Sequence, residues 1–205
     1  MEIVREPILK PVAIADLRPT QITLGLREVE ERRRHWRALK GRKQKFLETH
    51  MIPVILGPDH RHYIIDHHHL ARALHDEGQK DVLVIVVDDL GKLTKESFWF
   101  VMDCRDWTHP FDEHGKRRDV KDIPKSVDKM IDDPYRALAG ELRRVGGYSK
   151  ETTPFSEFLW ADFLRHRIKK KTVEKHYARA LKEAQKLAKS HDADYLPGWC
   201  GLVAD

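Results

Sequence analysis

The stretch Tyr63-Ile64-Ile65-Asp66-His67-His68-His69-Leu70-Ala71-Arg72-Ala73-Leu74 decides the fold. Its first residues are aromatic and β-branched, as is typical of a strand, and its last residues have the apolar composition of a helix. A carboxylate and three consecutive imidazoles lie between them, where packing alone gives little reason for polar side chains. Because a helix N-terminus presents unpaired N–H groups and a partial positive charge, this strand-to-helix turn indicates a site for an anion.

The composition is that of a soluble domain with a core of its own. The 205 residues are 40% apolar and 35% charged, with a net charge of +5. The longest apolar run, residues 82–87, is too short to span a membrane, and the N-terminus lacks the apolar core of a signal peptide. We therefore expect a cytoplasmic protein without a membrane partner, whose Cys104 and Cys200 are reduced thiols.

Hydrophobic patterning predicts an α/β (α+β) fold with two parts. The first part, residues 8–103, has the order of a small mixed-sheet core, and the second part, residues 104–205, reads as a loop or lid followed by a helical extension packed on the core. Turn residues at 57–60 predict a hairpin. The expected strands are residues 10–15, 52–56, 61–65 and 81–87, and the expected helices are residues 26–39, 70–77, 95–102, 134–145, 154–168 and 173–188.

Four segments carry a resemblance to a known superfamily: residues 16–21, 63–74, 133–140 and 154–163. In this combination the chain resembles the ParB/sulfiredoxin-like superfamily, and within it the ParB-like nuclease branch. The resemblance implies a phosphate-binding strand-to-helix turn. The chain departs from the superfamily pattern, with His67 at the usual glycine and Leu70 at the usual arginine. It also lacks the sulfiredoxin cysteine and the arginine-rich box of segregation proteins.

The turn supplies the predicted catalytic residues, Asp66, His68 and His69. Whether the backbone there is extended or helical, three successive side chains cannot all point at one atom. We therefore expect one or two imidazoles to face a ligand and another to hold the scaffold. Asp66 has a second interpretation as the N-cap of the helix, with its carboxylate accepting an N–H of the first turn.

A second group of residues is predicted to bind phosphate or nucleotide. Arg18, Thr20 and Gln21 offer guanidinium, hydroxyl and amide groups on a loop stiffened by a proline, and His67 and Arg72 flank the helix start. The alternative for the loop is an ordinary surface in which the arginine pairs with a carboxylate. Arg72 could equally point to solvent.

Metal binding is a further hypothesis for the turn. Asp66, His67 and His69 are the candidate ligands, and Mg²⁺ arriving with a nucleotide suits a carboxylate and substrate phosphates. Zinc is less favoured because zinc sites gather three or four ligands separated in sequence, although His60 and His62 lie close by.

The sequence thus leaves two classes of function open. One is a protein that binds a nucleotide or phosphate ester, with nucleotide hydrolysis, phosphoryl transfer or nuclease activity at the turn. The other is a non-catalytic module that binds DNA or a protein partner. Its DNA contacts would come from a basic run that could equally be a solvated helix end, Arg165, Arg167, Lys169, Lys170 and Lys171.

Overall fold

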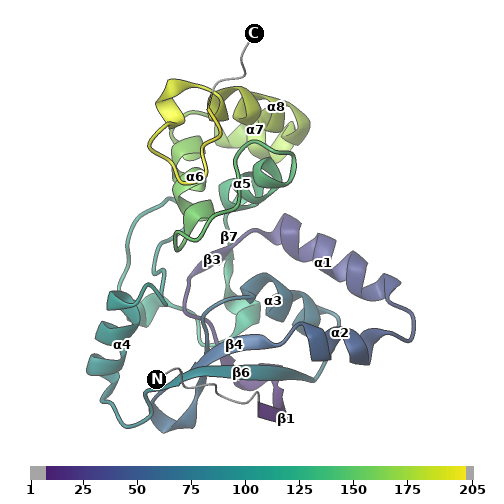
Figure 1. The fold of residues 1–205 in the computed structure, drawn as a ribbon, viewed down its shortest axis with the longest axis vertical. Coiled ribbons are helices and arrows are strands. Elements are labelled where there is room, and N and C mark those ends of the chain that lie inside the picture. The colour runs from purple at the N-terminus through teal and green to yellow at the C-terminus, as the bar shows by residue number, and fades with distance from the viewer. Residues whose placement is uncertain (1–7, 202–205) are drawn as a thin grey trace. The chain divides into compact units, whose positions relative to one another are not determined.

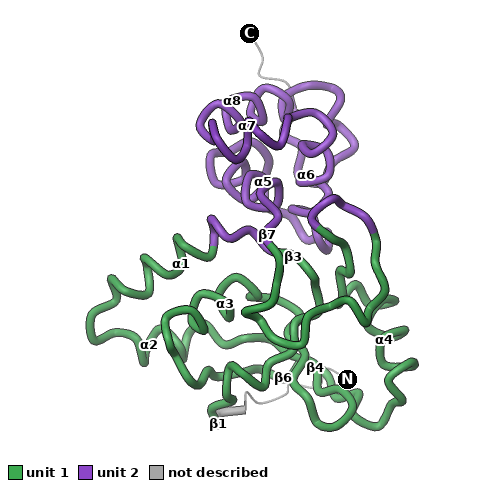
Figure 2. Tube along the Cα trace, turned by 180° about the vertical axis from the view of Figure 1, so that it is seen from behind, with its two compact units in different colours: residues 1–23, 29–112, 117–131 green, residues 24–28, 113–116, 132–205 purple. Residues whose placement is uncertain are grey.

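The computed structural model describes the backbone of residues 8–201 and the side chains of residues 11–201. The chain divides into two compact units (Figure 2). The sheet unit holds the residues up to 23, 29–112 and 117–131, and the helical unit holds residues 24–28, 113–116 and those from 132 onward. Residues 104–112 and 117–131, which the sequence analysis places in the second part as a loop or lid before the helical extension, lie in the sheet unit.

A five-stranded mixed sheet forms the centre of the sheet unit (Figure 1). Its outer pairs are β1 with β6, antiparallel, and β5 with β2, parallel; in the middle, β4 runs parallel to β6 and antiparallel to β5. This arrangement confirms the predicted α+β class and mixed sheet. In sheet order the strands are β1 (Ile8–Ala13), β6 (Asp81–Asp89), β4 (Ile52–Leu56), β5 (His62–Ile64) and β2 (Leu17–Arg18).

The two faces of this sheet are covered by different helices. One face packs Val54 and Ile64 into a core with α1 (Leu26–Ala38), α2 (Lys43–Thr49) and α3 (His68–Asp76). On the other face, Ile55 and Tyr63 pack against α4 (Lys95–Cys104). Because side chains alternate along a strand, neighbouring residues of β4 and β5 serve opposite cores.

The predicted hairpin between β4 and β5 is present. Within its connection, residues 57–61, Asp59 at φ 60° and His60 at φ 54° are both left-handed, and the N–H of Arg61 donates to the Pro58 carbonyl, as in a type I′ turn. Gly57 precedes the turn, and a Cβ there would lie 2.5 Å from Cε2 of Tyr63. Glycine is therefore needed at this position to let the aromatic ring pack against the backbone.

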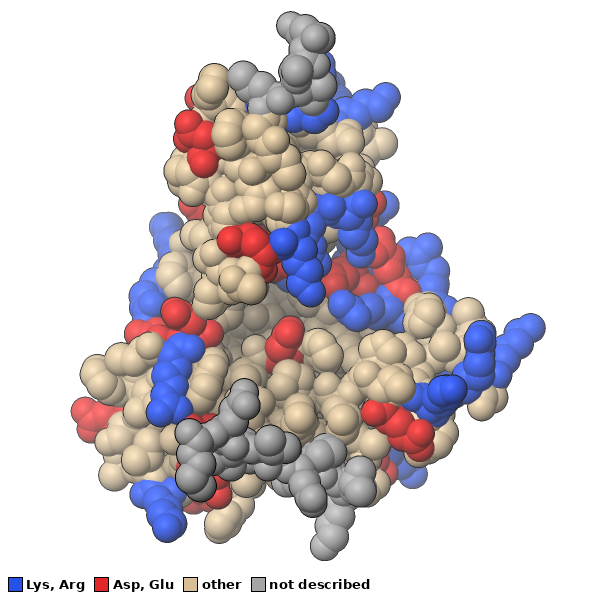
Figure 3. All heavy atoms as spheres, in the orientation of Figure 1, with Lys and Arg blue, Asp and Glu red and all other residues tan. Residues whose placement is uncertain are grey.

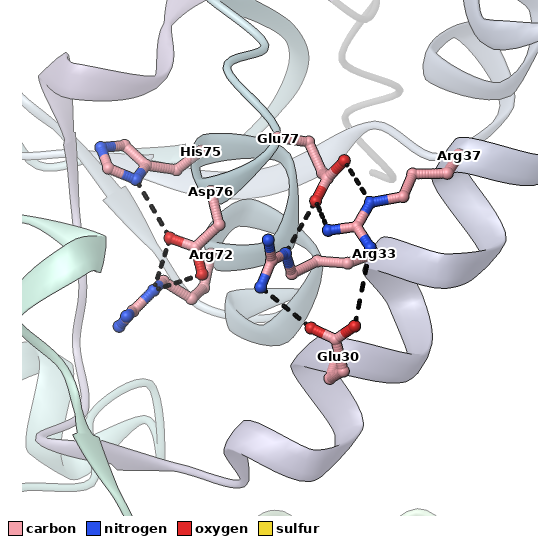
Figure 4. A network of polar contacts seen from close by, with 7 residues as sticks. All are labelled: Glu30, Arg33, Arg37, Arg72, His75, Asp76 and Glu77. Atoms are coloured by element: carbon pink, nitrogen blue, oxygen red, sulfur yellow. Dashed lines mark hydrogen bonds and ion pairs between the residues drawn. The ribbon is translucent and has the colours of Figure 1, made fainter.

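Helix α3 ends in a charged network that joins it to α1 (Figure 4). The carboxylate of Glu77 accepts hydrogen bonds from Arg33 at 2.8 Å and from Arg37 at 2.8 and 2.6 Å. These bonds lower the pKa of Glu77 from 4.5 to about 2. Glu30 pairs with the same two arginines from within α1. Gly78, at φ 72°, then ends the helix as predicted.

The helical unit has its own core around Trp160, which stacks on Tyr148 with ring centroids 4.3 Å apart. The helix predicted to open at Pro154 begins at Ser156, because Phe155 is left-handed at φ 56°. The single helix predicted for residues 173–188 is wrong: His176, at φ −135° and ψ 52°, separates two helices. The helices are α5 (Pro134–Arg144), α6 (Ser156–Arg165), α7 (Lys170–Lys175) and α8 (Tyr177–Ala188).

Among the helices of the described residues, none is long and apolar enough to cross a membrane. Short elements complete the described chain. A two-stranded sheet pairs β3 (Thr23–Leu24) with β7 (Ile131–Asp132). The 3-10 helices are η1 (Ile14–Asp16), η2 (Pro58–His60), η3 (Val120–Asp122), η4 (Val127–Lys129) and η5 (His191–Ala193).

Candidate functional site

The turn between β5 and α3 is built around a left-handed histidine. His67 has φ 65° and ψ 23°, is the N-cap residue of α3, and supplies no side-chain cap. Its Nδ1 lies 3.1 Å from the carbonyl oxygen of Met51. The exposed carboxylate of Asp66 accepts the N–H of His67 at 2.6 Å. The interpretation of Asp66 as the N-cap is therefore wrong, because its carboxylate bonds the residue before the helix and not the first turn.

His68 joins this turn to the predicted loop at residues 18–21. It is buried, and its Nε2 accepts the backbone N–H of Thr20 at 3.2 Å. This bond requires the neutral imidazole with its proton on Nδ1, since a protonated Nε2 would meet another donor. His68, which the sequence predicts as a catalytic residue, therefore holds the loop at Thr20 through Nε2 in this structure. His69 is also buried, at 6% exposure.

Thr20 and Gln21 are held inside the sheet unit. The Thr20 hydroxyl donates to the carbonyl of Ile64 at 2.6 Å, and the Thr20 carbonyl accepts from the Thr108 hydroxyl at 2.7 Å and from the N–H of His109 at 2.9 Å. Gln21 is buried and forms a parallel β-bridge with His109. The amide, hydroxyl and carbonyl of Thr20 thus all have protein partners, so this residue positions His68 and the turn.

Arg72 lies on α3 among internal partners. Its Nε donates to both oxygens of Asp76, at 2.9 and 3.1 Å, and one terminal nitrogen donates to the carbonyls of Val127 at 3.2 Å and Met130 at 3.4 Å. Figure 4 shows the pair it forms with Asp76, which also contacts His75. These bonds tie α3 to the segment after η3 and occupy the guanidinium that was predicted to reach a ligand.

Arg18 lies on the opposite face of the sheet from the α3 turn. It is paired in register with Tyr63, and Tyr63 packs against α4, whereas Leu17 packs into the core beneath α3. The structure therefore separates the side chain of Arg18 from that of Thr20, although only Pro19 lies between them in sequence. The Arg18 guanidinium donates to the carbonyl of Lys125 and lines a cavity of about 260 Å³.

The metal and zinc hypotheses concern the same turn. Within residues 11–201 no group of three or more His, Cys, Asp or Glu side chains is placed to hold a metal ion, so Asp66, His67 and His69 do not form such a group. His60 is exposed on the hairpin turn, and burial lowers the pKa of His62 in β5.

The basic run at the end of α6 is partly engaged within the helical unit. Arg165 is 13% exposed and forms ion pairs with Asp133 at 2.6 Å and Asp162 at 3.0 Å. Arg167 lies over the ring of Phe163, with its guanidinium carbon 3.9 Å from the ring centroid. Of the three lysines, Lys170 pairs with Glu174 at 3.7 Å, and Lys169 and Lys171 are exposed.

Comparisons with known proteins show which family the chain belongs to. A search of curated proteins gave no match. Among solved structures, the crystal structure of protein Atu1540 from Agrobacterium tumefaciens is similar to this chain, with 50% sequence identity and a TM-score of 0.88 over 94% of this chain and 98% of that one. The model of the family described as "Putative ParB-like nuclease" matches residues 10–166, and the chain belongs to this family of ParB-like nucleases.

Proposed function

We propose that the β5–α3 turn binds a phosphate group of a nucleotide or another phosphate ester, and that the protein acts on that ester by hydrolysis or phosphoryl transfer. The observation that carries this proposal is the start of α3, a helix N-terminus without a side-chain cap that follows a left-handed residue. Backbone N–H groups at such a terminus attract anions, and the helix dipole adds to this attraction.

The neighbouring side chains support distinct roles. Asp66 is the exposed carboxylate of the turn and is suited to orient a water or hold a hard cation such as Mg²⁺. His67 donates its Nδ1–H to the Met51 carbonyl, so its Nε2 can donate to a phosphate oxygen when the ring is the imidazolium, in which both nitrogens carry a proton. His68 and Thr20 fix the turn from behind. His69 is retained as a candidate for proton transfer.

Thermal unfolding with a nucleotide panel tests the binding. A ligand at roughly 100 times its Kd stabilises the native state by about 2.7 kcal/mol, which raises the Tm of a chain of this size by roughly 5–10 °C. ATP, CTP and their monophosphates are compared with and without Mg²⁺. The variant His67→Asp adds a negative charge at the helix start, which favours the helix but repels a phosphate. We expect it to fold and to lose the shift for a triphosphate.

His114→Asp is the matched control, because it makes the same charge change at an exposed histidine outside the sheet unit. Asp66→Asn should keep the ligand shift and lose the cleavage of a phosphodiester or nucleotide. The binding proposal is wrong when no nucleotide or phosphate ester raises the Tm, or when His67→Asp and the control respond alike. The catalytic part is wrong when no phosphate ester is cleaved or transferred, or when Asp66→Asn retains full activity.

The alternative of a DNA-binding module is less well supported, because Arg165 is committed to two carboxylates. It depends on the exposed Lys169 and Lys171. Binding of DNA that weakens steeply with salt and is lost when these two lysines are neutralised would favour it.

A further inference from the structure

The cavity beside Arg18 lies within the sheet unit and is formed by four separate segments. Its wall consists of the end of β2, the β4–β5 turn with the start of β5, helix α4, and residues 120–125. Five of the lining side chains are cationic and one is a carboxylate: Arg18, Arg61, Lys95, Lys121, Lys125 and Asp59. Figure 3 shows basic and acidic side chains interspersed on one face of the molecule, whereas cations outnumber carboxylates five to one in the lining of this cavity.

The positive charges of this cavity are incompletely neutralised. Within the described part of the chain, neither Arg61 nor Lys125 forms an ion pair through its side chain. Lys95 is 4.0 Å from Asp59, at the limit of an ion pair and exposed to solvent. Arg18 donates one N–H to the Lys125 carbonyl, which orients its guanidinium, and it has no carboxylate partner among the described residues. Clustered cations of this kind attract an anion, and arginine suits the geometry of phosphate.

The same cavity has an aromatic wall. Trp99 and Tyr63 both line it and contact each other edge to face, with ring centroids 5.5 Å apart. Arg61 and Arg18 line the cavity together with Tyr63. Burial raises the pKa of Tyr63, and the positive charges of the two arginines act in the opposite direction. Aromatic rings next to arginines and lysines are the arrangement that binds a planar base together with its phosphate.

The volume limits the ligand to one small molecule. About 260 Å³ is just below the usual range of small-molecule pockets, roughly 300–1,000 Å³. A phosphate with one sugar and one base is a suitable size, whereas a duplex cannot enter. We propose that this cavity is a second anion site, on the sheet face opposite the α3 turn, that binds a nucleoside monophosphate with its phosphate on the cations and its base against Trp99.

Calorimetric titration of the full chain tests this site with AMP, adenosine and inorganic phosphate as probes. We expect AMP to bind at least about tenfold more tightly than either of the others, because only AMP engages both walls. The double variant Arg61→Glu/Lys121→Glu should weaken AMP by at least about tenfold. Lys40→Glu/Lys45→Glu changes the net charge equally at exposed positions away from the cavity and should leave AMP binding unchanged.

Two further variants test whether the aromatic wall contributes to AMP binding and whether the cavity binds independently of the α3 turn. Trp99→Leu keeps an apolar side chain and should weaken AMP but not inorganic phosphate. In His67→Asp, the part of AMP binding that depends on Arg61 and Lys121 should remain. Arg61→Glu/Lys121→Glu should leave the triphosphate effect at the α3 turn intact. The second site is refuted by absent AMP binding, by equal losses in the two double variants, or by a Trp99→Leu variant that binds AMP as tightly as the parent. It is also refuted if His67→Asp abolishes all AMP binding.

Discussion

Replacing Glu77 by glutamine tests the junction between α1 and α3, which supports the sheet face beneath the turn. The carboxylate is 12% exposed and accepts three hydrogen bonds from Arg33 and Arg37. A pKa lowered from 4.5 to about 2 corresponds to roughly 3 kcal/mol of favourable interaction. Arg37 is half exposed, so solvent screening reduces this value. We expect Glu77→Gln to lower the free energy of unfolding by about 1–2 kcal/mol at pH 7.

The sign of the pH dependence follows from the direction of the shift. A carboxyl group whose pKa is lower in the folded state contributes stability above its unfolded pKa and loses that contribution as the pH falls toward its folded pKa. The difference between the parent and Glu77→Gln should therefore shrink as the pH is lowered from 5 toward 2. Urea unfolding followed by circular dichroism at pH 7, 5 and 4 measures this difference.

Glu30→Gln is the matched control. Glu30 pairs with the same two arginines from α1, but its side chain is 44% exposed, so we expect a loss below about 0.5 kcal/mol. Equal losses in the two variants, or a Glu77→Gln effect that does not change with pH, would refute the reasoning.

Two further substitutions test the cores of the units. Asp133→Ala removes a carboxylate that is 1% exposed and leaves Arg165 with one exposed partner, so the free energy of unfolding should fall by about 3 kcal/mol. Asp162→Ala should lower it by less than about 0.5 kcal/mol, and denaturant titration compares the two variants. Gly57→Ala places a methyl group 2.5 Å from a tyrosine ring carbon and should cost about 1–3 kcal/mol, while Gly91→Ala, whose nearest neighbour is a side-chain oxygen at 3.1 Å, should cost less in the same titration.

Local chemistry explains which elements the sequence predicts. The hairpin turn has glycine, proline and aspartate at positions where these residues favour a turn, and Gly78 supplies the positive φ that ends α3. The division between α7 and α8 carries no such signal. His176 is neither glycine nor proline, and its backbone conformation is accommodated by the packing of Val173 and Ala180 into the core of the helical unit.

The candidate site is predictable only as far as its residues are local. The turn at Asp66–His69 is contiguous, so its position between strand and helix is visible in the sequence. The contact of Thr20 with His68 crosses 48 residues and depends on the pairing of β2 with β5. Proximity in the sequence predicts that Arg18 and Thr20 act together. The register of β2 instead places Arg18 beside Tyr63 on the other face of the sheet.

The backbone conformation of His67 bears directly on whether the turn can bind a phosphate. The superfamily resemblance places a glycine here, and a left-handed backbone is accessible to glycine without steric cost. Histidine at φ 65° keeps that conformation at an energetic disadvantage, which the contact of its Nδ1 with the Met51 carbonyl helps to offset. The left-handed conformation that suits glycine is thus present at the start of α3 with a histidine in its place. Since an anion at a helix start is bound chiefly by backbone N–H groups, histidine at this position is compatible with the proposed phosphate binding and adds an imidazole beside it.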